Sequence, residues 1–99
     1  MLNELRLDAQ IAEKSPVRYT PAGIPVTDLK LAHQSSQTEA GNLRQVNCEV
    51  VAVAMGEQAL LLATAPLGSA LRVSGFLAAK SLKNRSLVLH VTQTEFLEG

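Results

Sequence analysis

Three stretches of the chain alternate between hydrophobic and polar residues, a pattern typical of β-strands with one buried face. They are Leu5–Ile11, Leu71–Lys80 and Leu87–Phe96. Gly75 lies inside the second stretch and indicates a bend or a close approach of another backbone. The sequence therefore predicts one strand near the N-terminus and two in the last third of the chain.

Two more strands are predicted in the middle of the chain. In Val26–His33 the apolar positions change phase, so we expect a β-bulge near residues 27–28. Arg44–Met55 is apolar at both parities and rich in β-branched residues, which predicts burial on both faces toward its end. Between them, Gln34–Asn42 is polar and aperiodic, which predicts a mobile loop of about nine residues.

Turns and one helix connect these strands. In Thr20–Pro25, Pro21 suits the second position of a tight turn and Gly23 suits a position with positive φ. Gly56–Ala65 is rich in leucine and alanine and has little β-branching, which predicts a helix of two or three turns. The last connection, Ser81–Ser86, is a polar and basic loop.

The predicted order is β-β-β-α-β-β within one domain, residues 1–99, a length that supports a single core. Five strands with a helix between the third and the fourth match the OB-fold, a partly open Greek-key barrel. The predicted fold class is therefore all-β with one short helix. In OB-folds the ligand crosses strands two and three, between the loop joining strands one and two and the loop joining strands four and five.

Composition narrows the classes of function. Nine basic residues balance nine acidic ones, which excludes a uniformly basic nucleic-acid-binding domain but allows a local basic patch. The single cysteine, Cys48, fits a reducing cytosol, and no apolar run approaches the roughly 20 residues of a membrane helix. The N-terminus has no apolar leader segment. We therefore expect a cytoplasmic protein.

Few residues suit catalysis. His33 and His90 lack metal-ligand partners at a useful spacing, and no glycine-rich phosphate loop is present. We expect Cys48 to be a buried, inert thiol, His90 to be a partly exposed strand residue, and Phe76 and Phe96 to belong to the core. No catalytic residue, metal or cofactor is predicted. A small enzyme is the least favoured hypothesis, although OB-folds host varied ligands.

Charge is distributed unevenly along the chain. The stretch from Gln58 to Thr94 has no acidic residue and contains four basic ones: Arg72, Lys80, Lys83 and Arg85. Three of the four lie in or beside the predicted loop between strands four and five, where an OB-fold grips its ligand. An equally weighted alternative is a solvated hairpin tip whose charges prevent edge pairing.

Other side chains extend this basic loop into a candidate groove. Lys30 alternates with leucines and so points away from the core, Arg18 and Tyr19 lie in the first loop, and Arg44 begins the third strand. Tyr19 is the best candidate for stacking on a base. We expect these cations to converge in one electropositive groove, because phosphate neutralisation supplies most sequence-independent affinity for nucleic acid.

Several stretches resemble a known family. Thr20–Val26, the Leu29–Ala32 strand and Gly68–Phe76 resemble bacterial single-stranded-DNA-binding proteins. An ordered set of residues over nearly the whole chain resembles the primosomal replication protein N family more closely: Pro21, Gly23–Pro25, His33, Glu39–Gly41, Arg44–Gln45, Cys48 and Val88–His90.

The resemblance implies a non-catalytic OB-fold homodimer that binds single-stranded DNA when collapsed replication forks are restarted. It implies that the protein bridges DNA to the PriA helicase and stimulates it, and that DnaT is a partner in some bacteria. Carried over to matching positions, it implies DNA contacts by Arg18, Arg44 and Lys83. We add Lys30, Lys80 and Arg85 to the candidate DNA-binding residues on local charge.

This sequence departs from the better-known enterobacterial members of the family. Asn47, also a candidate DNA contact, stands where those members have Trp, Asn42 stands where they have an aromatic residue, and Gln34 replaces a basic one. Ala9 replaces a glycine, and the basic loop is shorter. Because losing a stacking residue costs about 1–3 kcal/mol per base, we expect weaker DNA binding than is usual in the family. The alternative is therefore a protein-interaction module with weak or vestigial DNA binding.

Dimerisation is also expected from the strand count. A five-stranded barrel of this size leaves an open edge, and the edge of the first strand is able to pair with its twin. The alternative is a monomer that protects this edge with Glu4, Arg6 and Asp8.

Overall fold

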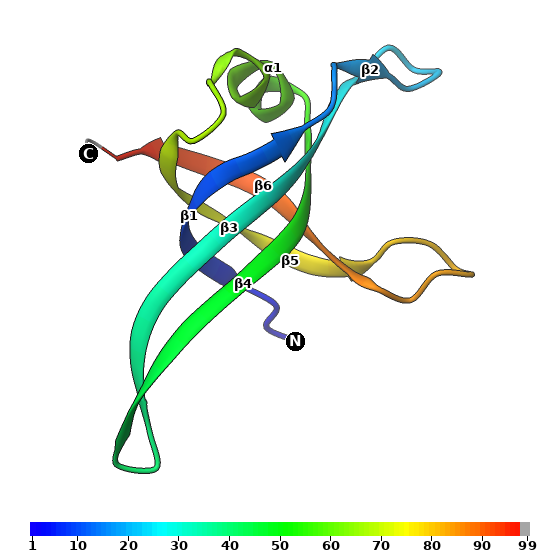
Figure 1. Cartoon of the computed structure of the whole chain (residues 1–99). Coiled ribbons are helices and arrows are strands. Elements are labelled where there is room, and N and C mark those ends of the chain that lie inside the picture. Colours follow the sequence, from blue (N-terminus) through cyan, green and yellow to red (C-terminus); the bar gives the residue numbers. More distant parts are fainter. Residues whose placement is uncertain (98–99) are drawn as a thin grey trace.

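The alternating segments form one curled sheet in the computed structural model, which describes residues 1–97 (Figure 1). The elements in chain order are β1 (Leu5–Lys14), β2 (Arg18–Tyr19), β3 (Pro25–Glu39), β4 (Asn42–Met55), α1 (Glu57–Thr64), β5 (Ala70–Ala79) and β6 (Leu87–Phe96). Because β2 has only two residues, five long strands make the barrel. The predicted all-β OB-fold with one short helix is confirmed.

The barrel closes because β1 has two neighbours. The strand order is β1-β5-β6-β4-β3-β2, and β1 also pairs with β3. β1 lies against β5 over Leu5–Gln10 and against β3 from Gln10 onward. Neighbouring strands are antiparallel except β4 and β6, which run parallel. Free sheet edges remain on β1 over Leu5–Ala9, where β1 is not paired with β3, and along the β3–β4 hairpin beyond the barrel.

The core is aliphatic, as the scarcity of aromatic residues requires. Its largest fully buried side chains are Ile11, Leu31, Leu62, Leu71 and Leu89. The helix α1 covers one end of the barrel and contributes buried Ala59 and Leu62 (Figure 1). The only buried polar residue in the described part of the chain, Thr27, donates its hydroxyl to the Ala59 carbonyl at 3.0 Å and so ties β3 to the helix.

The predicted bulge in β3 is wrong. The β3–β4 register runs without interruption from Val26 opposite Met55 to Glu39 opposite Asn42. The phase change has a different cause: Val26 packs with Val53 and Val88 in a small second cluster, whereas the leucines of β3 join the main core. A bulge is present in β1 instead, between Ile11 and Glu13.

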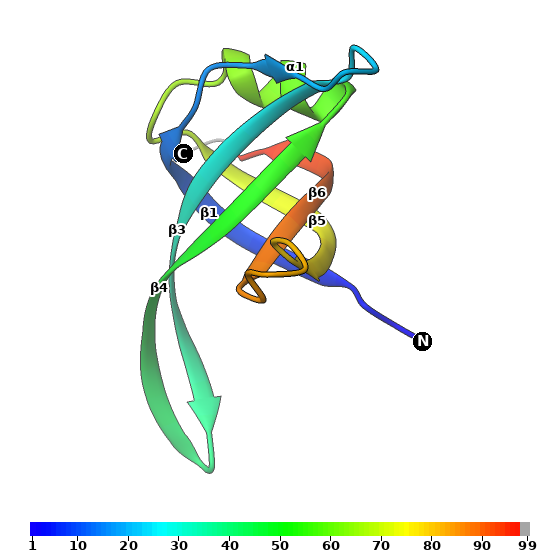
Figure 2. The ribbon, with the colours of Figure 1, turned by 90° about the vertical axis from the view of Figure 1, so that its right-hand side faces the viewer.

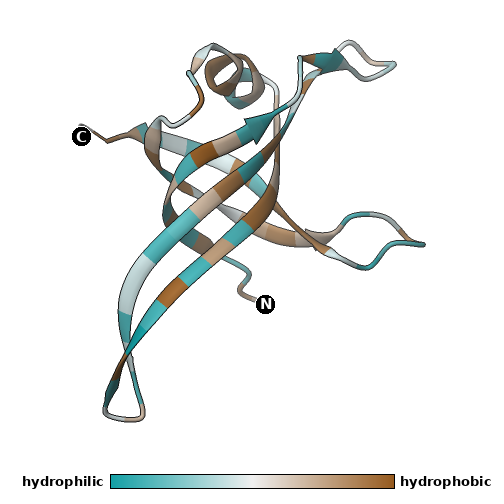
Figure 3. Cartoon of the chain, viewed as in Figure 1, coloured by the Kyte–Doolittle hydropathy of each residue, from teal (hydrophilic) through white to brown (hydrophobic). Residues whose placement is uncertain are grey.

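The predicted loop Gln34–Asn42 is also wrong. The chain continues as paired strand through this region and reverses at Ala40–Gly41, where both φ angles are positive (52° and 82°) as a two-residue hairpin turn prefers. The hairpin extends well beyond the barrel (Figure 1). Both of its faces therefore meet water, and Figure 3 shows it as mostly hydrophilic. Its polarity reflects position outside the barrel and not a lack of structure.

Gly75 confirms the expected close backbone approach. A Cβ built on this residue would lie 1.8 Å from the His90 carbonyl oxygen on the neighbouring strand. The β5–β6 register shifts between Ser74 and Gly75, so the two strands touch where the sheet bends. Only a residue without a side chain fits there.

Candidate nucleic-acid interface

One outer side of the barrel has the layout of an OB ligand face. It lies on β3 and β4 between the turn after β2 and the β5–β6 loop; Figure 2 shows that loop toward the viewer, with β2 above and the hairpin below. We name this side the framed face. Strand alternation and pairing place on it, from β3 and β4, Val26, Asp28, Lys30, Ala32, Gln34, Asn47, Glu49, Val51, Val53 and Met55, and from β5 and β6, Phe76, Val88 and His90.

The β5–β6 loop presents three cations at the rim of the framed face. Lys80, Lys83 and Arg85 are exposed, and none forms an ion pair within residues 1–97. The loop is braced internally, because the Lys80 amide donates to the Ser86 carbonyl at 2.9 Å and the Ser81 amide to the Asn84 carbonyl at 2.9 Å. These cations are therefore held on one short scaffold and are available to an anion.

The cations on the strands are bound by the chain's own carboxylates. Arg18 donates from Nε (3.0 Å) and from its terminal nitrogen (3.2 Å) to the two carboxylate oxygens of Asp28, which raises the pKa of Arg18. Lys30 Nζ lies 3.3 Å from Glu13 Oε2. The framed face therefore has two of these cations and three carboxylates, namely Asp28, Glu13 and Glu49, of which Glu49 is unpaired within residues 1–97. The strands themselves are not electropositive.

The structure does not gather the predicted cations into one groove. Arg18 and Lys30 flank Asp28, but Arg44 lies near the tip of the long hairpin and pairs with Glu39 at 2.9 Å. Its register position opposite Gln37 places Arg44 on the other side of the ribbon from Asn47, which lies on the framed face. Tyr19 is exposed, and strand alternation turns it away from Arg18. The convergence expected from sequence is therefore wrong, and within residues 1–97 the β5–β6 loop is the place where the predicted cations gather without carboxylate partners.

A stacked aromatic pair was missed at the sequence level. The rings of Phe76 on β5 and His90 on β6 lie parallel, with centroids 4.9 Å apart and an interplanar angle of 6°. Phe76 is 40% exposed and its partner is half-buried, so the expected core position of Phe76 is wrong, as is that of Phe96, which is 44% exposed. In the alternation of its strand, Phe76 occupies a position on the polar face, and this indicated that its ring is exposed. Its pairing with His90 depends on the β5–β6 register, which the sequence does not show.

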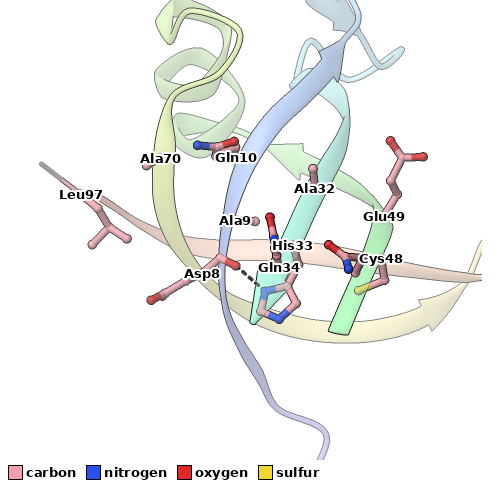
Figure 4. Close-up of a pocket in the computed structure, with 11 residues that line it drawn as sticks. Asp8, Ala9, Gln10, Ala32, His33, Gln34, Cys48, Glu49, Ala70 and Leu97 are labelled. Atoms are coloured by element: carbon pink, nitrogen blue, oxygen red, sulfur yellow. Dashed lines mark hydrogen bonds between the residues drawn. The ribbon is translucent and has the colours of Figure 1, made fainter. Parts of the chain in front are cut away.

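A second concavity lies beside the framed face and shares with it Ala32, Gln34, Asn47 and Glu49. It is an open groove of about 800 Å³ between β1 and the base of the hairpin, and it includes His33 and Cys48 (Figure 4). The Nδ1 atom of His33 lies 2.7 Å from the Asp8 carbonyl oxygen and links the diverging strands. Cys48 is exposed there, so its predicted burial is wrong.

The charge of this groove differs from that of the cationic β5–β6 loop. Its lining contains the carboxylates Asp8 and Glu49 but neither lysine nor arginine. The Asp8 carboxylate accepts two hydrogen bonds from Arg72, at 2.6 and 2.9 Å, and these hydrogen bonds lower the pKa of Asp8. The groove therefore has nothing with which to neutralise a phosphate.

The described part of the chain shows neither a metal cluster nor a membrane-spanning helix. In the range 1–97, no three histidine, cysteine, aspartate or glutamate side chains gather closely enough to hold a metal ion. No helix within the same range is long and apolar enough to cross a membrane.

The known proteins that are similar to this chain are named as single-strand binding proteins or replication restart proteins. Residues 3–93 match the family described as "Another single-strand binding protein family". The chain is 42% identical to "Replication restart protein PriB" of Bordetella pertussis, over 99% of this chain and 92% of that protein, and 36% identical to the protein of the same name from Nitrosomonas europaea, over 96% and 88%.

Solved structures agree with the sequence relatives. PriB from Ralstonia solanacearum superposes with a TM-score of 0.90 at 34% identity, covering 99% of this chain and all of that one. The single-stranded DNA binding protein from Thermus aquaticus gives 0.78 at 27% identity, covering 99% of this chain and 51% of that one.

Proposed function

Because this chain belongs to the replication restart protein PriB family of single-strand binding proteins, we propose that it binds single-stranded DNA as a non-enzymatic accessory protein of replication restart. Primosomal replication protein N is another name for PriB, so the family expected from the sequence is confirmed. In this role the protein acts in the cytoplasm, bridges DNA to the PriA helicase and stimulates it, with DnaT as a further partner where that loader exists.

One observation carries the DNA-binding part of this proposal. The three cations of the β5–β6 loop, which form no ion pair within residues 1–97, lie in the connection between the two strands that hold the Phe76–His90 stack, beside the framed face. Phosphates bind the loop, and bases turn toward the stack and the apolar side chains Val51 and Met55, which are both about half exposed. This division suits a single strand, whose bases are free to turn away from its backbone.

The test is a fluorescence-anisotropy titration of the intact protein with a labelled oligothymidine. We expect saturable binding that weakens as salt rises, because each phosphate contact releases counterions. Absence of binding even at low salt contradicts a direct role at DNA.

Phe76 is expected to contribute by stacking. Phe76→Ala removes one of the two rings of the Phe76–His90 stack. We expect it to weaken DNA binding by about 1–3 kcal/mol, roughly 5-fold to 150-fold. Phe76→Leu keeps an apolar side chain without an aromatic face, and we expect it to weaken binding similarly while its urea unfolding midpoint stays near that of the wild type. Titration of both variants measures the effect. If Phe76→Leu binds as the wild type does, bases do not stack there.

We also propose that the protein is a homodimer in which a second copy covers the groove beneath the hairpin. Over Leu5–Ala9, β1 pairs with β5 on one edge, and its ladder with β3 begins only at Gln10. The groove beside that edge exposes Cys48, and a two-stranded ribbon is marginally stable when nothing packs on it. A second β1 would complete both the sheet and this surface.

Sedimentation is expected to give about twice the 10.6 kDa of one chain, and Cys48 is expected to react slowly with a thiol reagent until dilution separates the copies. A 10.6 kDa species at micromolar concentration, with a thiol that reacts equally fast at every concentration, contradicts the dimer.

One observation favours a second candidate function, a protein-interaction module with vestigial DNA binding. Three of the six predicted cations are already paired with carboxylates in the chain. Replacing Lys83 and Arg85 with glutamate distinguishes the two functions. The module keeps its stimulation of the helicase after these reversals, whereas the DNA-binding protein loses it.

A further inference from the structure

We propose that the carboxylates of Asp28, Glu13 and Glu39 compete with DNA phosphate for Arg18, Lys30 and Arg44. In this proposal the chain's own ion pairs weaken its binding to single strands and reduce the number of phosphates it neutralises. The proposal rests on the proposed function and names residues that limit the protein's affinity for DNA.

Asp28 is built to hold Arg18. Its backbone is fixed on both sides by Ser15, whose hydroxyl accepts from the Asp28 amide at 3.1 Å and whose amide donates to the Asp28 carbonyl at 2.9 Å. With the strand fixed, both carboxylate oxygens meet the guanidinium of Arg18 at 3.0 and 3.2 Å. A phosphate is also recognised by two parallel hydrogen bonds from a guanidinium, so it competes for the donors that Asp28 already holds.

Glu13 reaches Lys30 because of the β1 bulge. Odd-numbered residues of β1 face the core up to Ile11, and uninterrupted alternation would turn Glu13 inward. The register shift between Ile11 and Glu13 reverses that parity. Glu13 then lies opposite Lys30, with Nζ and Oε2 3.3 Å apart, while Lys14 turns inward and donates to the Ala63 carbonyl at 2.8 Å, at the end of α1.

Glu39 and Arg44 flank the tight turn of the hairpin. Their side chains meet at 2.9 Å, and each is about two-thirds exposed. Like the other two pairs, this one is open to solvent, so loss of its carboxylate is expected to leave the protein folded. In the wild type each of these cations is held by a carboxylate, so the three cations add little to the neutralisation of phosphate.

The experiment replaces each carboxylate with its uncharged amide: Asp28→Asn, Glu13→Gln and Glu39→Gln. Each released cation is expected to take one phosphate, which steepens the slope of log K against log salt by about 0.7 and tightens binding about 5-fold near 0.1 M salt. Glu49→Gln is the matched control, because Glu49 lies on the framed face and forms no ion pair within residues 1–97. It removes the same charge without releasing a cation, so its slope is expected to stay near that of the wild type.

A double variant separates release of a cation from a general change in charge. Adding Arg18→Gln to Asp28→Asn is expected to return the slope to that of the wild type, because the released donor is gone. The proposal is overturned if the three amide variants change slope and affinity no more than Glu49→Gln does. If the wild type binds no DNA at any salt, the proposed function fails; if the wild type binds and the amide variants do not tighten, only this inference fails.

Discussion

Replacing Lys80, Lys83 and Arg85 together with glutamate is expected to weaken binding to single-stranded DNA by about 100-fold or more near 0.1 M salt. Each phosphate contact on a single strand contributes a slope of about 0.7, so three contacts account for about two decades of affinity between 1 M and 0.1 M salt. The introduced carboxylates also repel the phosphates, which weakens binding further. Anisotropy titration of the variant against the wild type measures it.

The control for this reversal changes one cation on another side of the barrel, and the two effects are compared per reversed charge. Arg6 and Arg72 lie on the outer side of β1 and β5, away from the β5–β6 loop, and Arg72 is bound by Asp8 and Glu95. Arg6→Glu changes an exposed cation there without breaking an ion pair, and we expect less than a few-fold change. If Arg6→Glu weakens binding as much per charge as the loop reversal does, the loop is not the site of phosphate binding.

Gly75→Ala is expected to destabilise the barrel strongly. The added Cβ would lie 1.8 Å from the His90 carbonyl oxygen and 3.2 Å from the Cα of Val91, and these are backbone atoms that cannot rotate away. β5 and β6 must therefore separate, at a cost of about 3 kcal/mol or more. Urea denaturation measures this loss as a lower midpoint.

Ser74→Ala is the matched control for Gly75, since it changes the neighbouring residue of the same strand. Ser74 accepts a hydrogen bond from Thr92 through its backbone carbonyl, which the substitution leaves in place. We expect a loss below about 1 kcal/mol. A Gly75→Ala protein as stable as Ser74→Ala would contradict the close strand contact and, with it, the β5–β6 register that positions the Phe76–His90 stack.

Local pattern was sufficient for much of the barrel. The alternation of β1, the helix over residues 57–64 and the proline-glycine turn before β3 depend on neighbours within a few positions, and the structure has them as predicted. Gly23 has a φ of 83°, and Gly75 marks the strand contact that its position indicated. These features follow from side-chain period and from backbone geometry that only glycine tolerates.

The features that failed depend on residues far apart in the sequence. Residues 34–42 are polar because they lie outside the core, and this polarity predicts a loop. They form a strand because the opposite strand of the hairpin supplies their hydrogen bonds. Arg18 and Lys30 were expected in an electropositive groove, because spacing along one strand does not show which carboxylate a neighbouring strand supplies. The bulge in β1 decides that Glu13 meets Lys30, and register decides that Phe76 meets His90.

The salt dependence of DNA binding tests the central claim most directly, namely that three loop cations neutralise the phosphates of a single strand. For the wild type we expect log K to fall against log salt with a slope of about −2, since three contacts contribute about 0.7 each. Exchanging Lys80, Lys83 and Arg85 for glutamine is expected to bring the slope close to zero. A slope that is near zero in the wild type, or one that the three glutamines leave unchanged, contradicts the account.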